Sequence, residues 1–496
     1  MNITIENILL IGSLLLLVSI IAGKTSYKFG VPTLILFLAI GMISGADGLG
    51  IYFDDPKIAQ FIGIVSLNFI LFSGGLDTDW ASTRSVLWQG VTLSSLGVLL
   101  TAVTLGIFVW AITDFTIYEG LLLGAIVSST DAAAVFSILR SNRLALKSKL
   151  RPTLELESGS NDPMAYVLTI AFLGLVVNQE KSFISVIPLF LQQMIIGALA
   201  GYLFGKVSTY IINKIKLDFE GLYPVLVIAL MFLTFSTTDF IGGNGFLAIY
   251  ICAVYLGNQD FIHKKSVLKV FDGLAWLVQI VLFLTLGLLV FPSQVVPFIG
   301  VGIIISLFLI FVARPFSVMV SLIPFRMRLR RRIYISWIGL RGAVPIVFAT
   351  YPLIAGIEKA SMIFNIVFFV SVTSVLIQGT TLSVIAKWLH VALPERVKPK
   401  SSVELFLSDR AKTVMAEIEI PDDCYAVGKE IVELHFPKTS LIAVINRGDK
   451  FITPSGSTVI EANDVLIVIA DNEQSINQVY DCLKVNPHDT TSHKKQ

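Results

Sequence analysis

Residues 1–395 form a succession of apolar runs separated by short polar loops, and this pattern restricts the fold more than any other feature of the chain. A run of ~20 apolar residues is long enough to cross a bilayer as a helix, and fewer suffice where a span is broken or buried in protein. About thirteen such runs can be counted, at residues 6–23, 31–46, 59–75, 86–111, 117–138, 155–177, 184–212, 222–238, 242–257, 268–291, 295–323, 333–355 and 361–385. We therefore predict an all-α polytopic membrane domain of about thirteen transmembrane helices.

Lysine and arginine residues occupy every second loop between these runs. The loops that carry them are residues 24–28, Arg84, 140–151, 214–216, 264–265 and 326–332. Short loops rich in lysine and arginine lie on the cytoplasmic side of membrane proteins. The alternation predicts a multi-pass protein of the plasma (inner) membrane, with its N-terminus outside and its C-terminal region in the cytoplasm.

Composition separates the chain into two regions. Of the 496 residues 55% are hydrophobic and only 15% are charged, and the region after residue 395 has the composition of a soluble protein. We predict a transmembrane domain at 1–395, a cytoplasmic domain at 401–485 and a disordered tail at 486–496. The net charge of +2 says nothing about nucleic acid, but the region after residue 395 has no basic stripe with interleaved aromatic residues, and we expect no nucleic-acid partner. The three cysteines lack the spacing of a metal site.

Two of the apolar runs are interrupted by residues that helices normally avoid. The fifth contains Thr130 and Asp131 within residues 127–135, and the twelfth contains Arg341 between glycine and proline within residues 338–346. Their places in the series differ by an odd number, so the two spans run in opposite directions. Such a pair is typical of inverted repeats, whose broken helices cross near the middle of the membrane and present half-helix ends to an ion. The alternative interpretation is a kink that serves only packing.

The sixth run opens with polar residues. Glu157 and Asn161 are four residues apart and share one helical face, and Ser158 and Asp162 share the adjacent face. An ionised aspartate deep in a bilayer costs about 2.5–3.5 kcal/mol on insertion scales, so such a residue is paired, wetted or functional. Pro163 lacks an N–H and leaves a carbonyl one turn earlier without its helical partner.

These groups supply the oxygen atoms that a monovalent cation requires. Asp162, Ser158 and Thr130 are the predicted ion- and proton-binding residues, together with the freed carbonyl. If a proton and a cation compete for one carboxylate, exchange follows, and near neutral pH this requires burial that favours the protonated form. The alternative is a permanent pair between Asp162 and Arg341 that only holds helices together. Glu157 is the better candidate for the Arg341 partner, because the cation needs a free Asp162.

Together these motifs resemble the NhaP-like (CPA1) group of monovalent cation/proton antiporters over about residues 1–390. The matching segments are Glu157-Ser158-X-X-Asn161-Asp162-Pro163, Thr130-Asp131, Gly339 to Pro345, Leu71 to Leu76 and Gly243 to Ala248. The resemblance implies a thirteen-span fold with inverted repeats and broken crossing helices, a core domain that moves against a dimerisation domain, and a homodimer.

The resemblance also implies roles for single residues. Asp162 would bind the ion and the proton, with Ser158 and Thr130 as ligands. Asn161, Glu157 and Arg341 would brace the site. Asp131 stays open between a place in the site and a role that only caps or orients the broken helix. An asparagine at position 161 and a single titrating carboxylate are similar to the electroneutral members.

The C-terminal region predicts a small α/β module. Residues 403–407, 413–420, 441–445, 450–453 and 465–469 have the pattern of strands, residues 427–434 and 472–483 that of helices, and residues 446–449 that of a hairpin turn. The segments Gly428-Lys429-X-Ile431, Ile442 to Gly448, Pro454-Ser455-Gly456 and Asn463 to Leu466 resemble the RCK_C (TrkA-C) regulatory domain of potassium transport proteins.

Domains of that kind dimerise, and some bind a small ligand such as cyclic di-AMP in the dimer cleft. The resemblance therefore implies a regulatory nucleotide site at Ala443, Val444, Ile445, Asn446 and Arg447. The alternative is a dimerisation module without a ligand. No glycine-rich dinucleotide fingerprint accompanies the module, so we expect no NAD-binding half and no other cofactor.

Three functions are compatible with a membrane body of this kind. The first is a secondary antiporter, not an enzyme, that exchanges cytoplasmic K⁺ (and/or Na⁺) for external H⁺ by alternating access; a Na⁺-selective antiporter is its variant. The second is a ligand-gated K⁺ channel, but the sequence lacks a selectivity-filter segment. The third is a membrane enzyme or sensor, for which no nucleophile–base set, metal cluster or phosphate loop is found. Arg314, in the eleventh run, is either a brace in the core or a residue that reaches the membrane surface.

Overall fold

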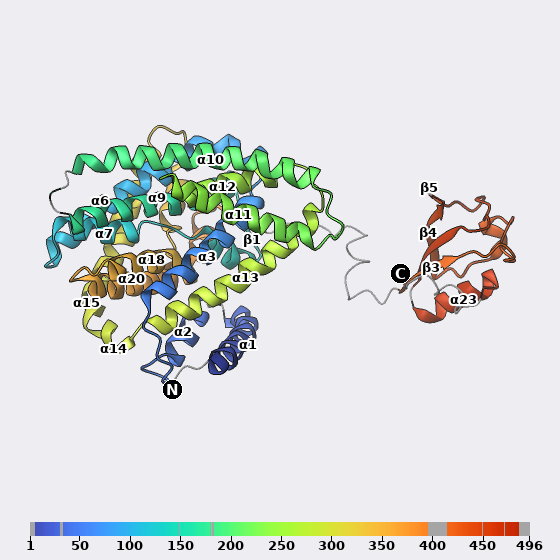
Figure 1. Cartoon of the computed structure of the whole chain (residues 1–496), viewed down its shortest axis with the longest axis horizontal. Coiled ribbons are helices and arrows are strands. Elements are labelled where there is room, and N and C mark those ends of the chain that lie inside the picture. Colours follow the sequence, from blue (N-terminus) through green and yellow to red (C-terminus); the bar gives the residue numbers. More distant parts are fainter. Residues whose placement is uncertain are drawn as a thin grey trace. The chain divides into compact units, whose positions relative to one another are not determined.

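A computed structural model describes residues 5–29, 33–147, 149–178, 180, 183–394, 414–448, 450–470 and 472–485. The chain divides into two compact units, residues 1–395 and 396–496. The first is built of helices and the second around a β-sheet (Figure 1). The strand predicted at 403–407 and the disordered tail predicted at 486–496 lie outside the described residues.

Within the described residues, eight helical segments are long and apolar enough to cross a membrane. Four of them are single helices, α3 (Pro56–Leu76), α9 (Leu150–Val177), α11 (Leu222–Phe240) and α13 (Lys264–Leu289). A fifth is α10 (Val186–Lys214), which follows a short 3₁₀ turn. The other three are composite: α4 (Trp80–Thr83), α5 (Leu87–Thr92) and α6 (Val98–Ile112); α14 (Pro292–Val295), α15 (Ile299–Phe308) and α16 (Arg314–Ser321); and α20 (Ala360–Ser374) with α21 (Thr380–Trp388).

Five further segments complete the set. Three are continuous, α1 (Ile5–Phe29), α2 (Thr33–Ser44) and α12 (Gly245–Gly257). Two spans are broken, one into α7 (Ile117–Ile126) and α8 (Ala132–Ser141), the other into α17 (Leu329–Trp337), α18 (Ala343–Phe348) and α19 (Thr350–Ile354). With the eight long segments, these five give thirteen candidate spans in the described part of the chain, in agreement with the predicted fold class, and the two broken spans are the fifth and the twelfth.

Matching irregularities mark the inverted repeat. The fourth span contains a π-helix at Leu93–Gly97, and the eleventh, again seven places later, contains one at Leu309–Ala313. π-Helices are rare and concentrate at functional sites. The two spans touch where the Thr101 hydroxyl donates to the Ser317 hydroxyl at 2.8 Å.

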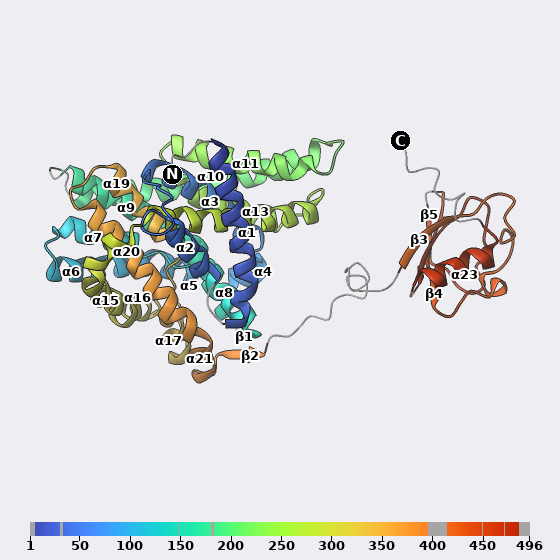
Figure 2. The ribbon, with the colours of Figure 1, turned by 90° about the horizontal axis from the view of Figure 1, so that it is seen from below.

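A small sheet tests the count of spans. β1 (Leu144–Leu146) follows the fifth span and pairs antiparallel with β2 (Ala392–Pro394), which follows the thirteenth (Figure 2). The arginine-rich loop that contains β1 and the segment after the last span therefore lie on the same side of the membrane unit. An even number of spans between them is what the predicted topology requires.

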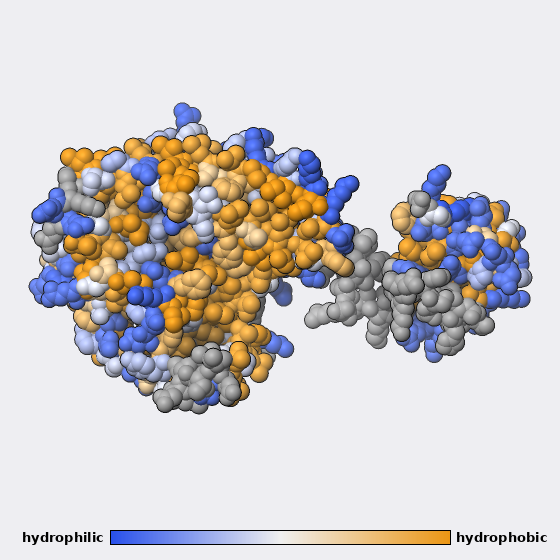
Figure 3. All heavy atoms as spheres, in the orientation of Figure 1, coloured by the Kyte–Doolittle hydropathy of each residue, from blue (hydrophilic) through white to orange (hydrophobic). Residues whose placement is uncertain are grey.

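The surface agrees with a bilayer environment. The visible face of the membrane unit is mainly apolar, whereas that of the second unit is mainly polar (Figure 3). Large apolar side chains stay exposed on the spanning helices, for example Leu199 and Leu203 of α10. Lipid-facing helices need no polar outer surface.

The second unit is a four-stranded antiparallel sheet in the order β3-β6-β4-β5, with α23 (Glu473–Leu483) packed against it. Its strands are β3 (Val414–Glu419), β4 (Ser440–Arg447), β5 (Lys450–Ile452) and β6 (Val465–Ala470). The predicted hairpin joins β4 to β5, with Gly448 at φ +62° in the turn. The helix predicted at 427–434 is wrong in extent, since only Ile431–Leu434 is helical, as a 3₁₀ turn.

Candidate functional site

The two helix breaks meet inside the membrane unit. The backbone N–H of Asp131 donates to the carbonyl of Leu340 at 2.8 Å, so the extended segments are joined directly. Their approach is close at Gly342, where a Cβ atom would lie 2.4 Å from the Asp131 carboxylate. Any larger residue at position 342 would have to displace the Asp131 side chain. The sequence prediction of two breaks that meet is confirmed.

The N-terminus of α8 is held by side chains. The carboxylate of Asp131 accepts from the N–H of Ala134 at 3.0 Å and caps the helix. The Ser158 hydroxyl, on α9, accepts from the N–H of Ala132 at 3.0 Å and donates to the Thr130 carbonyl at 2.9 Å. The break therefore depends on both side chains, and the open question about Asp131 is answered in favour of at least a capping role.

Arg341 holds the other end of the break in the fifth span, the end that follows α7. Its guanidinium donates to the carbonyl oxygens of Ser128 and Ser129, both at 2.5 Å, just beyond the C-terminus of α7. A cation is favourable there because the last carbonyls of a helix carry partial negative charge. Arg341 is 1% exposed. It braces backbone, and in the described residues it forms no ion pair with a carboxylate.

The predicted pairing of Glu157 with Arg341 is wrong. Glu157 forms a buried ion pair with Arg314, and both side chains are only 2% exposed. Arg314 begins α16, directly after the π-helix of the eleventh span. Of the two roles left open for Arg314, the core brace is therefore the observed one.

Asn161 contacts the break from the same helix. Its amide nitrogen donates to the Thr130 hydroxyl at 2.5 Å, and Asn161 is fully buried. The Thr130 hydroxyl thus accepts a hydrogen bond from Asn161, while its carbonyl accepts one from Ser158. Three of the predicted residues are brought together at a single point of the break.

The last span supports the twelfth break, which sequence reasoning missed. Gln378 donates to the Trp337 carbonyl at 2.9 Å, and the Ser374 hydroxyl accepts from the N–H of Arg341 at 3.1 Å. Gln378 lies in a π-helix, Val375–Gly379. The available signal was a serine and a glutamine four residues apart within an apolar run.

Asp162 has surroundings of a different kind. The hydroxyl of Ser129 donates a short hydrogen bond to its carboxylate, and none of the ion pairs in the described residues involves Asp162. This excludes a permanent pair with Arg341 in the described conformation. Ser129 was not predicted, because a residue in a non-helical break has no helical period to place it.

A cavity of about 240 Å³ leads to Asp162. At its inner end it is lined by Asp131, Ser158 and Asp162, and at its other end by Arg140 and Arg151 of the arginine-rich loop. The carboxylate is therefore accessible from the side of the membrane unit that carries β1 and β2.

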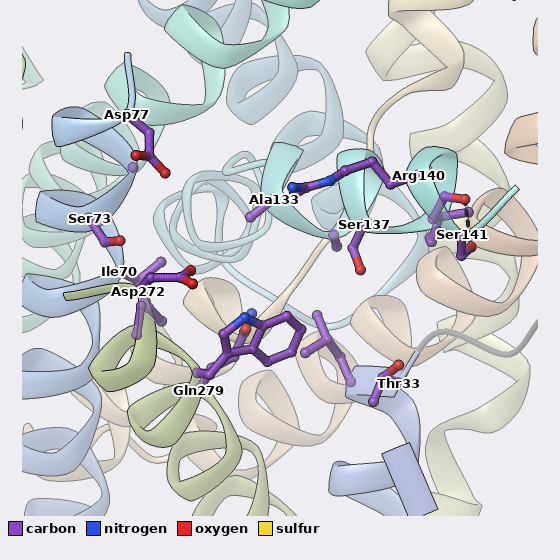
Figure 4. A pocket seen from close by; sticks show the side chains of 16 residues that line it. Thr33, Ile70, Ser73, Asp77, Ala133, Ser137, Arg140, Ser141, Asp272 and Gln279 are labelled. Atoms are coloured by element: carbon purple, nitrogen blue, oxygen red, sulfur yellow. Dashed lines mark hydrogen bonds between the residues drawn. The ribbon is translucent and has the colours of Figure 1, made fainter. Parts of the chain in front are cut away.

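An adjoining cavity of about 200 Å³ forms a vestibule that shares Asp77 and Arg140 with the first (Figure 4). The carboxylates of Asp77 and Asp272 and the guanidinium of Arg140 point into it. Asp77 lies in the loop after α3 and keeps contact with solvent. Partial burial, and next the Asp272 carboxylate, raises the pKa of Asp77, and Arg140 and Arg151 oppose this shift.

Aromatic side chains fill the space on the other side of Asp162. Tyr166, one turn further along α9, has its ring centroid 5.2 Å from that of Phe246 and 5.9 Å from those of Phe348 and Tyr351. Because α9 runs from the arginine-rich loop past Asp162 to Tyr166, this cluster lies opposite the cavity. The site is open on one side and packed on the other.

Comparison with known proteins assigns the whole membrane unit. The family model described as "Sodium/hydrogen exchanger, transmembrane" matches residues 13–388. The chain belongs to the sodium/hydrogen exchanger family. This exchanger is therefore a multi-pass membrane transporter rather than an enzyme, and a cation/proton antiporter. A second match, to the TrkA-C domain, covers residues 415–483 and confirms the predicted TrkA-C module.

Similar proteins extend over both units of the exchanger. It is 38% identical to the K(+)/H(+) antiporter NhaP2 of Shewanella baltica, over 95% of this chain and 82% of that protein. It is also 38% identical to the K(+)/H(+) antiporter NhaP of Alkalimonas amylolytica, over 93% of this chain and 80% of that protein. Among solved structures, the sodium proton antiporter MjNhaP1 of Methanocaldococcus jannaschii at pH 8 matches with a TM-score of 0.68 at 25% identity, over 78% of this chain and 99% of that one.

The predicted nucleotide-binding segment of the exchanger lies on β4. Its last residue, Arg447, donates to both carboxylate oxygens of Asp464, at 2.8 and 2.9 Å, and to Glu461. Asp464 is fully buried. The guanidinium thus holds the hairpin to the turn before β6, whereas Ala443 and Val444 remain partly exposed.

Proposed function

We propose that the exchanger moves cytoplasmic K⁺ outward in exchange for external H⁺, one for one, with Asp162 binding either the cation or the proton. The observation that carries this proposal is the Asp162 carboxylate itself. It is buried at the end of a cavity, accepts a hydrogen bond from Ser129 and takes part in no ion pair within the described residues. A carboxylate in this condition can change partners, and one titrating group exchanges one charge for one charge.

Alternating access follows from the two sides of the site. The cavity reaches the arginine-rich loop, which the positive-inside rule assigns to the cytoplasm, with the N-terminus outside. The described conformation is then the inward-open one, and the cluster around Tyr166 closes the outer path. Movement of the core spans against the remaining helices would open that side and close the other. Ser158 and Thr130 would contribute oxygen ligands during the cycle, with Asn161, Glu157 and Arg341 as braces.

The choice of K⁺ rests on two likenesses. The relatives at 38% identity are named as K⁺/H⁺ antiporters. The TrkA-C module resembles the regulatory domains of potassium systems. Na⁺ is the second candidate, favoured by the solved structure, which is that of a sodium proton antiporter.

The cytoplasmic unit regulates this exchange in our proposal. TrkA-C modules dimerise, and the whole chain would act as a homodimer whose tail responds to a nucleotide such as cyclic di-AMP bound near Ala443 to Asn446. Deletion of residues 401–496 should then change the response to the nucleotide more than the basal rate. A deletion that abolishes basal exchange in correctly inserted protein would contradict this division of roles.

Proteoliposomes that contain the purified full-length protein test the exchange directly. Acid-loaded vesicles that carry a pH-sensitive dye should lose their gradient on addition of K⁺, less on addition of Na⁺ or Li⁺, and at the same rate when an ionophore clamps the membrane potential. A rate that depends on the potential would contradict the one-for-one stoichiometry. A stronger response to Na⁺ would assign the second candidate instead.

A further inference from the structure

A third cavity, of about 710 Å³, separates two groups of helices. The fourth span and α9, which carries Asp162, form one wall, and α10 and α12 form the other. Its lining is largely apolar, with Val91, Leu156 and Met164 on the first wall and Met194, Ala198 and Ile251 on the second.

The cavity has one polar end. Asn258 lies there, accepting from the N–H of Trp80 at 2.9 Å and donating to the Thr78 carbonyl at 2.8 Å. Lys264 donates to the carbonyl of the neighbouring Gln259 at 3.0 Å. From Leu247 to Asn258 the cavity follows α12 for roughly 16 Å, about half the ~30 Å hydrocarbon thickness of a bilayer.

These dimensions argue for one kind of occupant. A cavity of ~150 Å³ with an apolar lining stays dry and accommodates a single benzene. The present cavity is more than four times larger, so it needs an apolar occupant with the length of one leaflet. At the polar end, the ammonium groups of Lys264 and of Lys206, which lies 4.7 Å above the Tyr202 ring, suit a phosphate headgroup.

We propose that this cavity binds one acyl chain of a membrane phospholipid, which enters from the leaflet on the Lys264 side and lies between the two groups of helices. The acyl chain would pack against the wall that also borders the cavity leading to Asp162. Tyr250 and Thr78 line both cavities. At Gly159 a Cβ atom would lie 2.3 Å from the Tyr250 ring, so the ring packs directly against α9 near Asp162.

A regulatory consequence rests on the proposed function. If the fourth span and α9 move against α10 and α12 during transport, the acyl chain occupies the surface along which they move. The rate of exchange then depends on the bound chain, in addition to the general effect of bilayer thickness.

Native mass spectrometry of the full-length protein, purified in detergent and titrated with phosphatidylglycerol, tests the site. Ala198→Phe fills the cavity. Leu199→Phe, the control, introduces a phenylalanine at the next residue, which is exposed on the lipid-facing side of α10. Wild type and Leu199→Phe should retain phospholipid, and Ala198→Phe should retain it about tenfold less tightly, a loss equal to 1.4 kcal/mol. Val254→Phe fills the cavity from α12 and replaces Ala198→Phe if that variant is not monodisperse.

Equal retention by the filled variants and Leu199→Phe, or no retention by wild type at saturating phosphatidylglycerol, would overturn the proposal. The exchange rate of each protein is then compared between C14 and C18 phosphatidylglycerol liposomes. The rate should change more between the two lipids for wild type and Leu199→Phe than for Ala198→Phe. Asp162→Asn should retain lipid like wild type. A protein without any exchange would therefore refute the proposed function and leave the lipid measurement decisive for this site.

Discussion

The surroundings of Asp162 and of Glu157 differ, although both carboxylates are buried on α9 and only five residues apart. Glu157 faces the eleventh span, where Arg314 neutralises it. Asp162 faces the fifth break and receives a hydrogen bond from a neutral hydroxyl, that of Ser129. The first environment satisfies a charge permanently. The second leaves room for a change of partner.

Under the proposed function, the comparison explains how one helix can provide both a fixed charge, at Glu157, and an exchangeable one, at Asp162. In low dielectric, removal of one partner from a buried ion pair is costly because the remaining charge has no solvent to stabilise it. Asp162 avoids that constraint, since a proton or a cation can supply the compensating charge from the cavity. Burial alone does not distinguish the two residues; the identity of the neighbour does.

Asp162→Asn should break the comparison most strongly. The amide is neutral and cannot bind a proton or neutralise a cation, so exchange should fall below detection, at least about a hundredfold. The protein should remain inserted and as thermally stable as wild type, because no ion pair is lost. Cation-dependent dequenching in proteoliposomes, together with a melting curve in detergent, checks both statements. Substantial residual exchange would remove Asp162 from its assigned role.

Glu157→Gln should have the opposite profile. It leaves the buried Arg314 without a countercharge, which is expected to cost about 3–5 kcal/mol of stability. The yield of folded protein and its melting temperature should drop, and any exchange that remains should retain its cation dependence. The double variant Glu157→Leu/Arg314→Met should recover much of the loss, because an apolar pair of similar volume is often neutral. A stable but inactive Glu157→Gln would instead give Glu157 a direct part in transport.

Ser129→Ala sharpens the account of Asp162. It removes a hydrogen bond to a charged acceptor, an interaction of about 1.5–3 kcal/mol. The ionised carboxylate is then less stable, and the half-saturating K⁺ concentration should rise about tenfold. Ser128→Ala is the matched control, since the Ser128 hydroxyl donates to the Ala125 carbonyl at 2.6 Å and does not bond to Asp162. Equal effects of the two variants would indicate damage to the break rather than to the carboxylate.

Sequence patterns predicted the spans, the breaks and the α9 residues because hydropathy and helical period depend on local chain geometry. The period placed Asn161 and Ser158 on faces that do meet the fifth break. It could not choose between Arg314 and Arg341 as the partner of Glu157. Both arginines lie in apolar runs, and the choice depends on how the eleventh span packs and on its π-helix, which shifts the residues after it.

Residues in irregular backbone were the other limit. Ser129 lies in the break, where neighbouring side chains follow no helical period, so its bond to Asp162 could not be predicted. In the second unit, residues 425–428 form a turn in which Gly428 adopts φ +80°, and Glu430 pairs with Val459 in an isolated bridge, so the predicted helix does not begin at residue 427. The strands around them were predicted because alternation of buried residues, as in β6, is a property of the strand itself.

The smallest expected effect concerns Asp77 in the vestibule, which lies outside the spans and keeps contact with solvent. The raised pKa of Asp77 means that it loses its charge at a higher pH than an ordinary carboxyl group as the solution is acidified. The attraction of the vestibule for a cation therefore weakens at a higher pH than it would with an ordinary carboxyl group. In Asp77→Asn the half-saturating K⁺ concentration should depend less steeply on acidification, because only competition at Asp162 remains.

The difference from wild type should reach about threefold at low ionic strength and disappear in high salt, since exposed charges interact weakly and are screened. Asp54→Asn, in the loop before α3 on the opposite side of the membrane unit, is the matched control and should follow wild type. Initial rates of K⁺-driven dequenching across a pH series measure both. Identical pH dependence in Asp77→Asn and wild type at low ionic strength would show that cations reach Asp162 without sensing the vestibule charge, and would confine the electrostatics of transport to the break itself.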